Sequence, residues 1–186
     1  RSSAASDVYK RQVLLIIGNR TGRFQEGKKK TFQGSNTPLA ALGALILWFG
    51  WFGFNGGANG AMDLRIPLIL INTFLAASAG LVLSSIMGIY VMKKPEPMFM
   101  ITGPIAGLVS ITASCAFVEP TEAIIIGSIG GIVSGSGIIL LEKIKVDDVV
   151  SAVPVHLFAG TWATIAVAIF GDLEAMGIEK SKLDQL

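Results

Sequence analysis

The sequence has few charged residues and few residues that bind metals. Of its 186 residues only 15% are Asp, Glu, Lys or Arg, whereas soluble domains carry about 25%. The net charge of +2 is too small to indicate a nucleic-acid surface, and no aromatic cluster lies among basic residues. This composition excludes an ordinary soluble domain and argues against nucleic acid as a partner.

Cysteine and histidine each occur once. A single cysteine cannot form an internal disulfide, and Cys115 lies in an apolar run without neighbouring metal ligands. We interpret Cys115 as a packing residue, because free cysteines behave as small hydrophobic side chains. We expect no metal site and no cofactor.

Hydrophobic residues make up 52% of the chain, and the mean hydropathy is +0.64. Five stretches without a charged residue are each long enough to cross a bilayer, which needs about 20 apolar residues. Backbone polar groups in hydrocarbon must bond within their own segment, so the sequence predicts an all-α integral membrane protein. The predicted transmembrane helices cover about 37–57, 66–91, 98–117, 122–141 and 150–170.

The flanking segments complete the predicted organisation. Residues 1–12 differ in composition from the rest and resemble a non-native lead, with no apolar core of a signal peptide. We expect 13–18 to end a preceding transmembrane helix and 19–36 to form a cytoplasmic loop. We interpret 171–186 as a truncated extracytoplasmic loop.

Basic residues are concentrated in alternate loops. The positive-inside rule places the loops that carry them in the cytoplasm, and it places the loop around Arg65 on the opposite side. The basic residues of the predicted cytoplasmic loops are Arg20, Arg23, Lys28, Lys29, Lys30, Lys93, Lys94, Lys143 and Lys145.

Glycines recur every four residues in two of the predicted spans. Gly103 and Gly107 share one face of the third, and Gly127, Gly131 and Gly135 share one face of the fourth. Small residues at this spacing let helix backbones approach closely in lipid, so we expect helix contacts there.

His156, the one histidine of the chain, lies within the last of these predicted spans. A polar side chain inside a bilayer is costly and marks a conduction pathway or a proton relay more often than a structural hydrogen bond, although both readings stay open. The low dielectric disfavours the charged imidazolium, so we expect a neutral ring that donates or accepts a proton. Pro154, two residues earlier, removes a backbone donor and is expected to loosen the helical ladder there.

A second unusual segment is rich in aromatic residues and glycine. Aromatic residues near the end of a span often form an interfacial belt, and that explanation stays open here. However, Trp51 and Phe54 are three positions apart and share a face, with Gly50, Gly53 and Gly57 around them. These rings could line a conduit and present their faces to a cation.

Four motifs in the same order and spacing make the chain similar to the Amt/Rh family of ammonium transporters. The resemblance covers about residues 13 to 170 and needs no large gap. The motifs are GWFGFNGG at 50–57, GPIAGLV at 103–109 with Ile111 and Thr112 after it, the pair Asp147 and Asp148, and VPVHL at 153–157.

The resemblance implies a fold of eleven transmembrane helices, the first ten of which form two five-helix repeats of inverted topology around a narrow pore. This chain would supply the second repeat. It implies a homotrimer that transports ammonium or ammonia, is not an enzyme, and has a cytoplasmic regulatory protein as a possible partner. By motif, His156 resembles the second of two pore histidines, Phe54 a gating phenylalanine and Trp51 a pore-lining aromatic. Thr112 and Ala152 are implied to line the same region.

The chain also departs from the family pattern. Ala58 stands where the family often has a serine whose hydroxyl helps to hold the ion outside the pore, so ion recruitment is expected to be weaker. Two other functions remain as alternatives. One is an ammonium sensor on the same fold, with a signalling domain further along the chain, and the other is an unrelated secondary transporter with a midplane histidine.

Overall fold

The computed structural model describes residues 16–24, 32 and 34–172, and the regular structure in this part is helical. The predicted lead at 1–12 and the predicted loop after Asp172 lie outside the described residues. Of the predicted preceding helix, Ile16 and Ile17 are described, and both are helical. The elements are α2 (Thr37–Ala58), α3 (Ile66–Met92), α4 (Pro97–Ile111), α5 (Pro120–Lys143), the π-helix η1 (Val153–Phe158) and α6 (Ala159–Phe170).

Local sequence signals set where these helices begin. Each of α2 to α5 has a proline in its first turn, where the missing N–H would have no helical partner. Asn36 caps α2 by accepting a 2.9 Å hydrogen bond from the Leu39 N–H. At the start of α5, Glu119 and Glu122 form a reciprocal capping box, which defines that helix end independently of the membrane.

Within the part of the chain that the structure describes, four helical segments are long and apolar enough to cross a membrane, namely α2, α3, α5 and the combined segment Val153–Phe170. The predicted helix at 98–117 is too long, because α4 ends at Ile111 and has 15 residues. Residues 112–117 form turns instead. Asn72 on α3 donates hydrogen bonds to the carbonyls of Cys115 and Val118, at 2.9 and 2.8 Å, and so satisfies backbone groups that no helix satisfies there.

The helix predicted at 150–170 begins three residues later and in a different form. Ser151 has a left-handed backbone (φ 54°), and the helix starts as the π-helix η1 before it continues as α6. The π-helix contains Pro154, at the place where the sequence predicted a loosened ladder. Pro154 stands in the first turn of η1, where its missing N–H would have no helical partner, so the proline does not by itself explain the wider turn.

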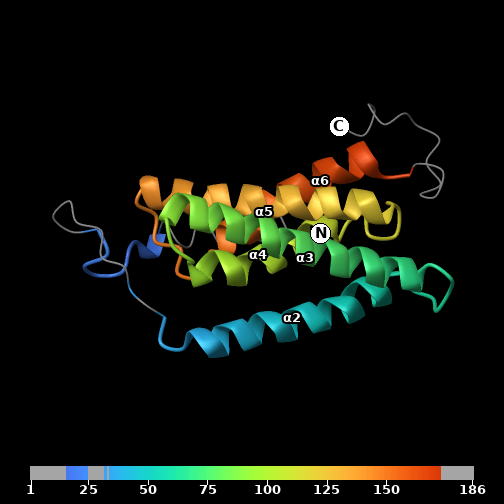
Figure 1. The fold of residues 1–186 in the computed structure, drawn as a ribbon, viewed down its shortest axis with the longest axis horizontal. Coiled ribbons are helices and arrows are strands. Elements are labelled where there is room, and N and C mark those ends of the chain that lie inside the picture. Colours follow the sequence, from blue (N-terminus) through green and yellow to red (C-terminus); the bar gives the residue numbers. More distant parts are fainter. Residues whose placement is uncertain (1–15, 25–31, 33, 173–186) are drawn as a thin grey trace.

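Helices α3, α4 and α5 pack against one another and form the centre of the bundle, while α2 runs along one side of it (Figure 1). The predicted glycine contacts are confirmed. A Cβ added at Gly80 of α3 would stand 2.6 Å from the carbonyl oxygen of Gly103 on α4, and one at Gly131 of α5 would stand 2.6 Å from that of Gly80. Cys115 is buried in the apolar core, as the sequence predicted.

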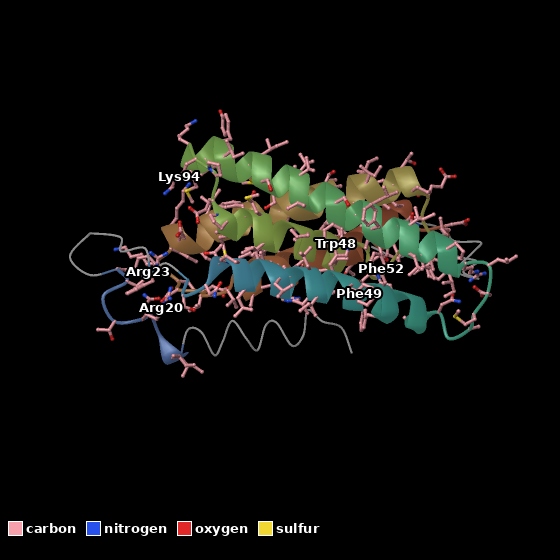
Figure 2. All side chains as sticks on the ribbon, turned by 60° about the horizontal axis from the view of Figure 1, so that its bottom comes forward. Arg20, Arg23, Trp48, Phe49, Phe52 and Lys94 are labelled. Carbon is pink, nitrogen blue, oxygen red and sulfur yellow. The ribbon has the colours of Figure 1, made fainter. Side chains whose placement is uncertain are left out.

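The loops predicted to share one side of the membrane lie at one end of the bundle. Arg20, Arg23 and Lys94 stand at the same end in Figure 2. Arg23 lies 3.0 Å from Glu142 at the end of α5, which ties the first and third of these loops together. The assignment of this end to the cytoplasm stays a prediction.

Candidate functional site

The aromatic segment of α2 presents two rings in contact. Trp51 and Phe54 have ring centroids 5.8 Å apart in an edge-to-face arrangement, a geometry that the quadrupoles of the two rings favour. Trp51 is half-buried, whereas Phe54 is 62% exposed. Figure 2 shows Trp48, Phe49 and Phe52 on the same stretch of α2.

A hydrogen bond fixes Trp51 to the end of α4. Its indole Nε1 donates to Thr112 Oγ1 at 2.8 Å, and the Thr112 hydroxyl in turn donates to the carbonyl of Leu108 at 2.7 Å. Thr112 stands directly after the last residue of α4. The structure therefore brings together Trp51 and Thr112, two of the site residues predicted from the sequence.

His156 lies in the π-helix η1. Like α2, this helix contacts α4. Val155 and Ala159 pack with Ala106 and Val109 of α4, and Trp51 packs against the same cluster. Among the described elements α2 contacts α3 and α4, while η1 contacts α4, α5 and α6. The α2 aromatics and the histidine helix are thus both packed against α4, while the backbones of α2 and η1 do not lie next to each other.

The backbone around His156 is irregular in a defined way. The Ala159 N–H points to the carbonyls of Pro154 and His156, so the register includes the five-residue spacing of a π-helix. Asp148 caps the start of this segment, because its Oδ2 accepts a 2.7 Å hydrogen bond from the Val153 N–H. Short π-helical segments often occur at functional sites, which agrees with a special role for this histidine.

Two further predicted residues lie at the edges of this region. Ala152 is half-buried and directly precedes η1, one turn before His156. Ala58 is exposed and is the last residue of α2. A cavity of about 230 Å³ at that end of the helix is lined by Gly56, Gly57, Gly60, Ala61 and Met62.

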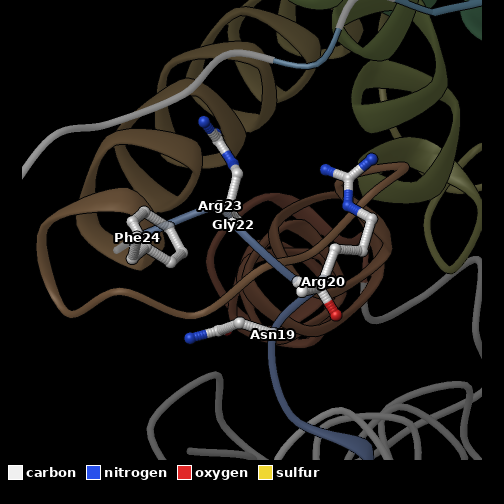
Figure 3. A pocket seen from close by; sticks show the side chains of 6 residues that line it. Asn19, Arg20, Gly22, Arg23 and Phe24 are labelled. Carbon is white, nitrogen blue, oxygen red and sulfur yellow. The ribbon is translucent and has the colours of Figure 1, made fainter. Parts of the chain in front are cut away.

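An ion-pair cluster holds the segment before η1. The guanidinium of Arg20 binds both oxygens of Asp147, with Nε at 2.7 Å from Oδ2 and Nη2 at 2.8 Å from Oδ1. Asn19 accepts a 3.0 Å hydrogen bond from the Asp147 N–H, and Arg23 Nε lies 3.6 Å from Oδ1. Figure 3 shows Arg20 and Arg23 at the adjoining cavity of about 320 Å³, which residues 19–24 line.

The charge of Asp147 is favoured by these contacts. Hydrogen bonds from the Arg20 side chain lower the pKa of the Asp147 carboxyl, and the charges of Arg20 and Arg23 act in the same direction against the effect of burial. The pKa of Arg20 is raised by the same hydrogen bond. Both groups are therefore ionised at neutral pH, and the pair links the loop after the preceding helix to the loop that leads into His156.

Two buried asparagines were not identified from the sequence. Asn55 and Asn72 are 2% and 0% exposed, and each donates side-chain hydrogen bonds inside the bundle. A signal for both existed, since an amide within a charge-free span needs a partner in hydrocarbon. Among the described residues no group of three or more His, Cys, Asp or Glu is arranged to hold a metal ion.

Comparisons with known proteins agree on one family. A family model described as the Ammonium Transporter Family matches residues 12–185. Ammonium transporter Amt2 of Archaeoglobus fulgidus is 44% identical over 161 residues, which cover 86% of this chain and 34% of that protein. Ammonium transporter 3 of Dictyostelium discoideum is 40% identical over 163 residues, with 84% of this chain and 38% of that protein covered. The chain spans about a third of the length of these curated relatives.

Solved structures give the same fold. A protein described as Sensor Amt Protein superimposes with a TM-score of 0.92 at 35% identity, over 99% of this chain and 46% of that chain. Mep2 of Saccharomyces cerevisiae superimposes with a TM-score of 0.86 at 24% identity, over 98% of this chain and 43% of that chain. The similarity to Mep2 supports the helical membrane fold alone.

Proposed function

The chain belongs to the Ammonium Transporter Family, and on that premise we propose that it forms one half of a pore that carries ammonium or ammonia across the cell membrane. It is part of an integral membrane protein, and the remaining half of the pore would come from the part of the relatives' length that it does not span. The relatives named above are described as ammonium transporters, which supports ammonium as the substrate.

The observation that carries this proposal is the position of His156. The one histidine of the chain lies in a π-helical segment that opens the membrane span Val153–Phe170. An ionisable ring is costly in such a span and normally marks a substrate pathway or a proton relay. Val155, the residue before His156, shares a packing cluster on α4 with the Trp51 ring. An aromatic ring and an imidazole are therefore supported by the same helix.

The chemistry follows from the cost of moving an ion into hydrocarbon. Desolvating an ammonium ion in an apolar pore costs on the order of tens of kcal/mol in the Born limit, which contacts with a few aromatic rings cannot offset. The ion is therefore expected to give up its proton before the narrowest part of the path. Neutral ammonia then passes, and an imidazole can accept or donate the proton because its charge change lies near neutral pH.

Each selected residue has a role in this scheme. Trp51 presents its ring to the cation before deprotonation, and Phe54 narrows the path so that only a neutral species passes. His156 takes part in the proton relay, while Thr112 holds Trp51 in place. Ala152 leaves room for the substrate beside His156. Potassium has no proton to lose, so selectivity would follow from chemistry and not from the size of the site.

The test uses the full-length protein in liposomes. Wild type is expected to take up methylammonium, and ammonium to compete with it. His156→Leu should lower uptake by about a hundredfold or more, the range for loss of a group that transfers protons. Thr161→Val on α6 is the matched control, since Thr161 is exposed and its hydroxyl donates to the Leu157 carbonyl of the same membrane span. Uptake at the wild-type rate by His156→Leu, with potassium still excluded, would refute this role.

A second candidate is an ammonium sensor, favoured by the 0.92 TM-score with the Sensor Amt Protein. In that case the protein would bind ammonium and signal through a further domain. Binding of ammonium without uptake in the same liposomes would favour the sensor.

The proposal also includes the partners that membership of this family implies. These are two further copies of the chain in a homotrimer, and a cytoplasmic regulatory protein.

A further inference from the structure

Helix α2 is attached to the bundle in an unusual way. Of its 22 residues only Ala44 and Asn55 are buried, although the helix is strongly apolar. Large side chains on it face outward, with Leu45, Ile46 and Phe49 between 59% and 79% exposed. Burial of apolar surface within this unit therefore does little to determine how α2 is rotated about its own axis.

Two directional hydrogen bonds connect α2 to its neighbours. Asn55 Nδ2 donates to Thr73 Oγ1 of α3 at 2.9 Å, and that hydroxyl donates to the carbonyl of Ile69 at 2.7 Å. Trp51 makes the 2.8 Å bond to Thr112 described above. Trp51 and Asn55 are four positions apart, so both bonds leave the same face of α2. The side-chain oxygen of Asn55, Oδ1, has no hydrogen-bond partner within the described part of the chain.

We propose that Asn55 and Thr73 are positioning residues that set the rotation of α2 and thereby the direction of the Phe54 ring. Phe54 directly precedes Asn55, and one residue corresponds to about 100° of rotation around an α-helix. A bond that holds the Asn55 amide against α3 therefore also holds the neighbouring ring on its exposed side. The effect on flux rests on the proposed function, whereas the effect on the position of α2 does not.

A ring contact between α2 and α3 does not replace that bond. The rings of Trp48 and Phe74 lie 5.8 Å apart at a tilt of 36°. Contacts between rings tolerate a range of angles, because offset and tilted arrangements have similar energies. A buried amide in hydrocarbon has few alternative partners, so its bond to Thr73 selects one orientation.

The experiment replaces the Thr73 hydroxyl and measures the position of residue 54 directly. Nitroxide labels are placed on Phe54→Cys and Ile86→Cys of the full-length protein without other cysteines, and labelled subunits are diluted with unlabelled ones. Ile86 lies on α3 and is 56% exposed. The distance distribution is compared for Thr73, Thr73→Val and Thr73→Ser. Ser78→Ala is the matched control, since Ser78 lies on α3 and bonds to its own helix at Phe74.

We expect Thr73→Val to widen the distance distribution about twofold, because the Asn55 amide loses its directional partner. Thr73→Ser and Ser78→Ala should keep the wild-type width. In the unlabelled protein with Phe54 intact, Thr73→Val should lower methylammonium uptake about threefold to tenfold, which corresponds to one interhelical hydrogen bond in a membrane. An unchanged distance distribution in Thr73→Val would overturn the inference. A wider distribution in a protein that transports nothing would support the positioning role and refute the proposed function.

Discussion

Trp51 on α2 and Thr112 at the end of α4 are 61 positions apart and are joined by a 2.8 Å hydrogen bond. The bond uses the one donor of the indole ring, so the ring has a single preferred orientation. The acceptor is the hydroxyl of Thr112, the residue that directly follows α4. Trp51, which the family resemblance implies to line the pore, is therefore held by Thr112, a second residue that the same resemblance placed at the pore.

Removing this bond should impair transport without unfolding the protein. Trp51→Phe keeps an aromatic ring but loses the donor, and Thr112→Val keeps the shape but loses the acceptor. Each should destabilise the α2–α4 contact by about 0.6 to 1.7 kcal/mol and lower methylammonium uptake severalfold. Thr112→Ser keeps the hydroxyl and should retain uptake. Equal uptake by Thr112→Val and Thr112→Ser would show that the bond has no functional role.

Loss of the Phe54 ring should make the pore less selective. Phe54→Ala opens the constriction and admits water, which lowers the cost of carrying a charged species. Leak of potassium from liposomes should rise, or the methylammonium flux should change. Phe49→Ala is the control, because Phe49 lies on the same helix and is 79% exposed. If both variants leave conductance and uptake unaltered, Phe54 faces lipid and is not a gate.

The Arg20–Asp147 pair should stabilise the protein above about pH 4. The pKa of Asp147 is lower in the folded protein than its ordinary value of about 3.9, so the folded state favours the ionised form. The stabilisation is fully present above the unfolded pKa and is lost as the pH falls through the folded pKa. Asp147→Asn should cost about 1 to 2 kcal/mol, at the low end because the Arg20 side chain is 40% exposed and screened by solvent.

Thermal unfolding of the full-length protein from pH 8 to pH 3 measures this difference. The difference in unfolding free energy between wild type and Asp147→Asn should stay constant down to about pH 5. It should shrink as the pH falls below the ordinary Asp pKa. Glu96→Gln, in another loop at the same end, serves as the control. A gap that does not depend on pH across this range would show that the charge of Asp147 contributes nothing.

The charge-free runs predicted the positions of the helices well, because a charged residue is costly in hydrocarbon and so marks the boundary of a span. They failed at residues 112–117, which are uncharged but form turns and a bend. The side chain of Asn72, about 40 residues earlier in the sequence, supplies the hydrogen bonds that make those turns possible. The residue pattern of one charge-free segment cannot show a hydrogen bond that comes from a different segment.

The site was predicted as a set of residue types but not as a network. The motif around Pro154 and His156 pointed to an irregular helix, since a proline removes a fixed donor. The bond from Asn55 to Thr73 and the pair between Arg20 and Asp147 depend on how distant segments meet. Sequence spacing indicates which residues share a face, but it does not indicate which helix that face contacts.

The contacts around Gly80 have a mechanical consequence. Helices that touch through side chains can slide a little, because the side chains change rotamers. At Gly80, Gly103 and Gly131 the main chains of α3, α4 and α5 come together, and a main chain has no rotamers to change. These three helices should therefore move as a single block. Any change of shape in this unit then falls on α2, η1 and α6, and the first two of these carry Phe54 and His156.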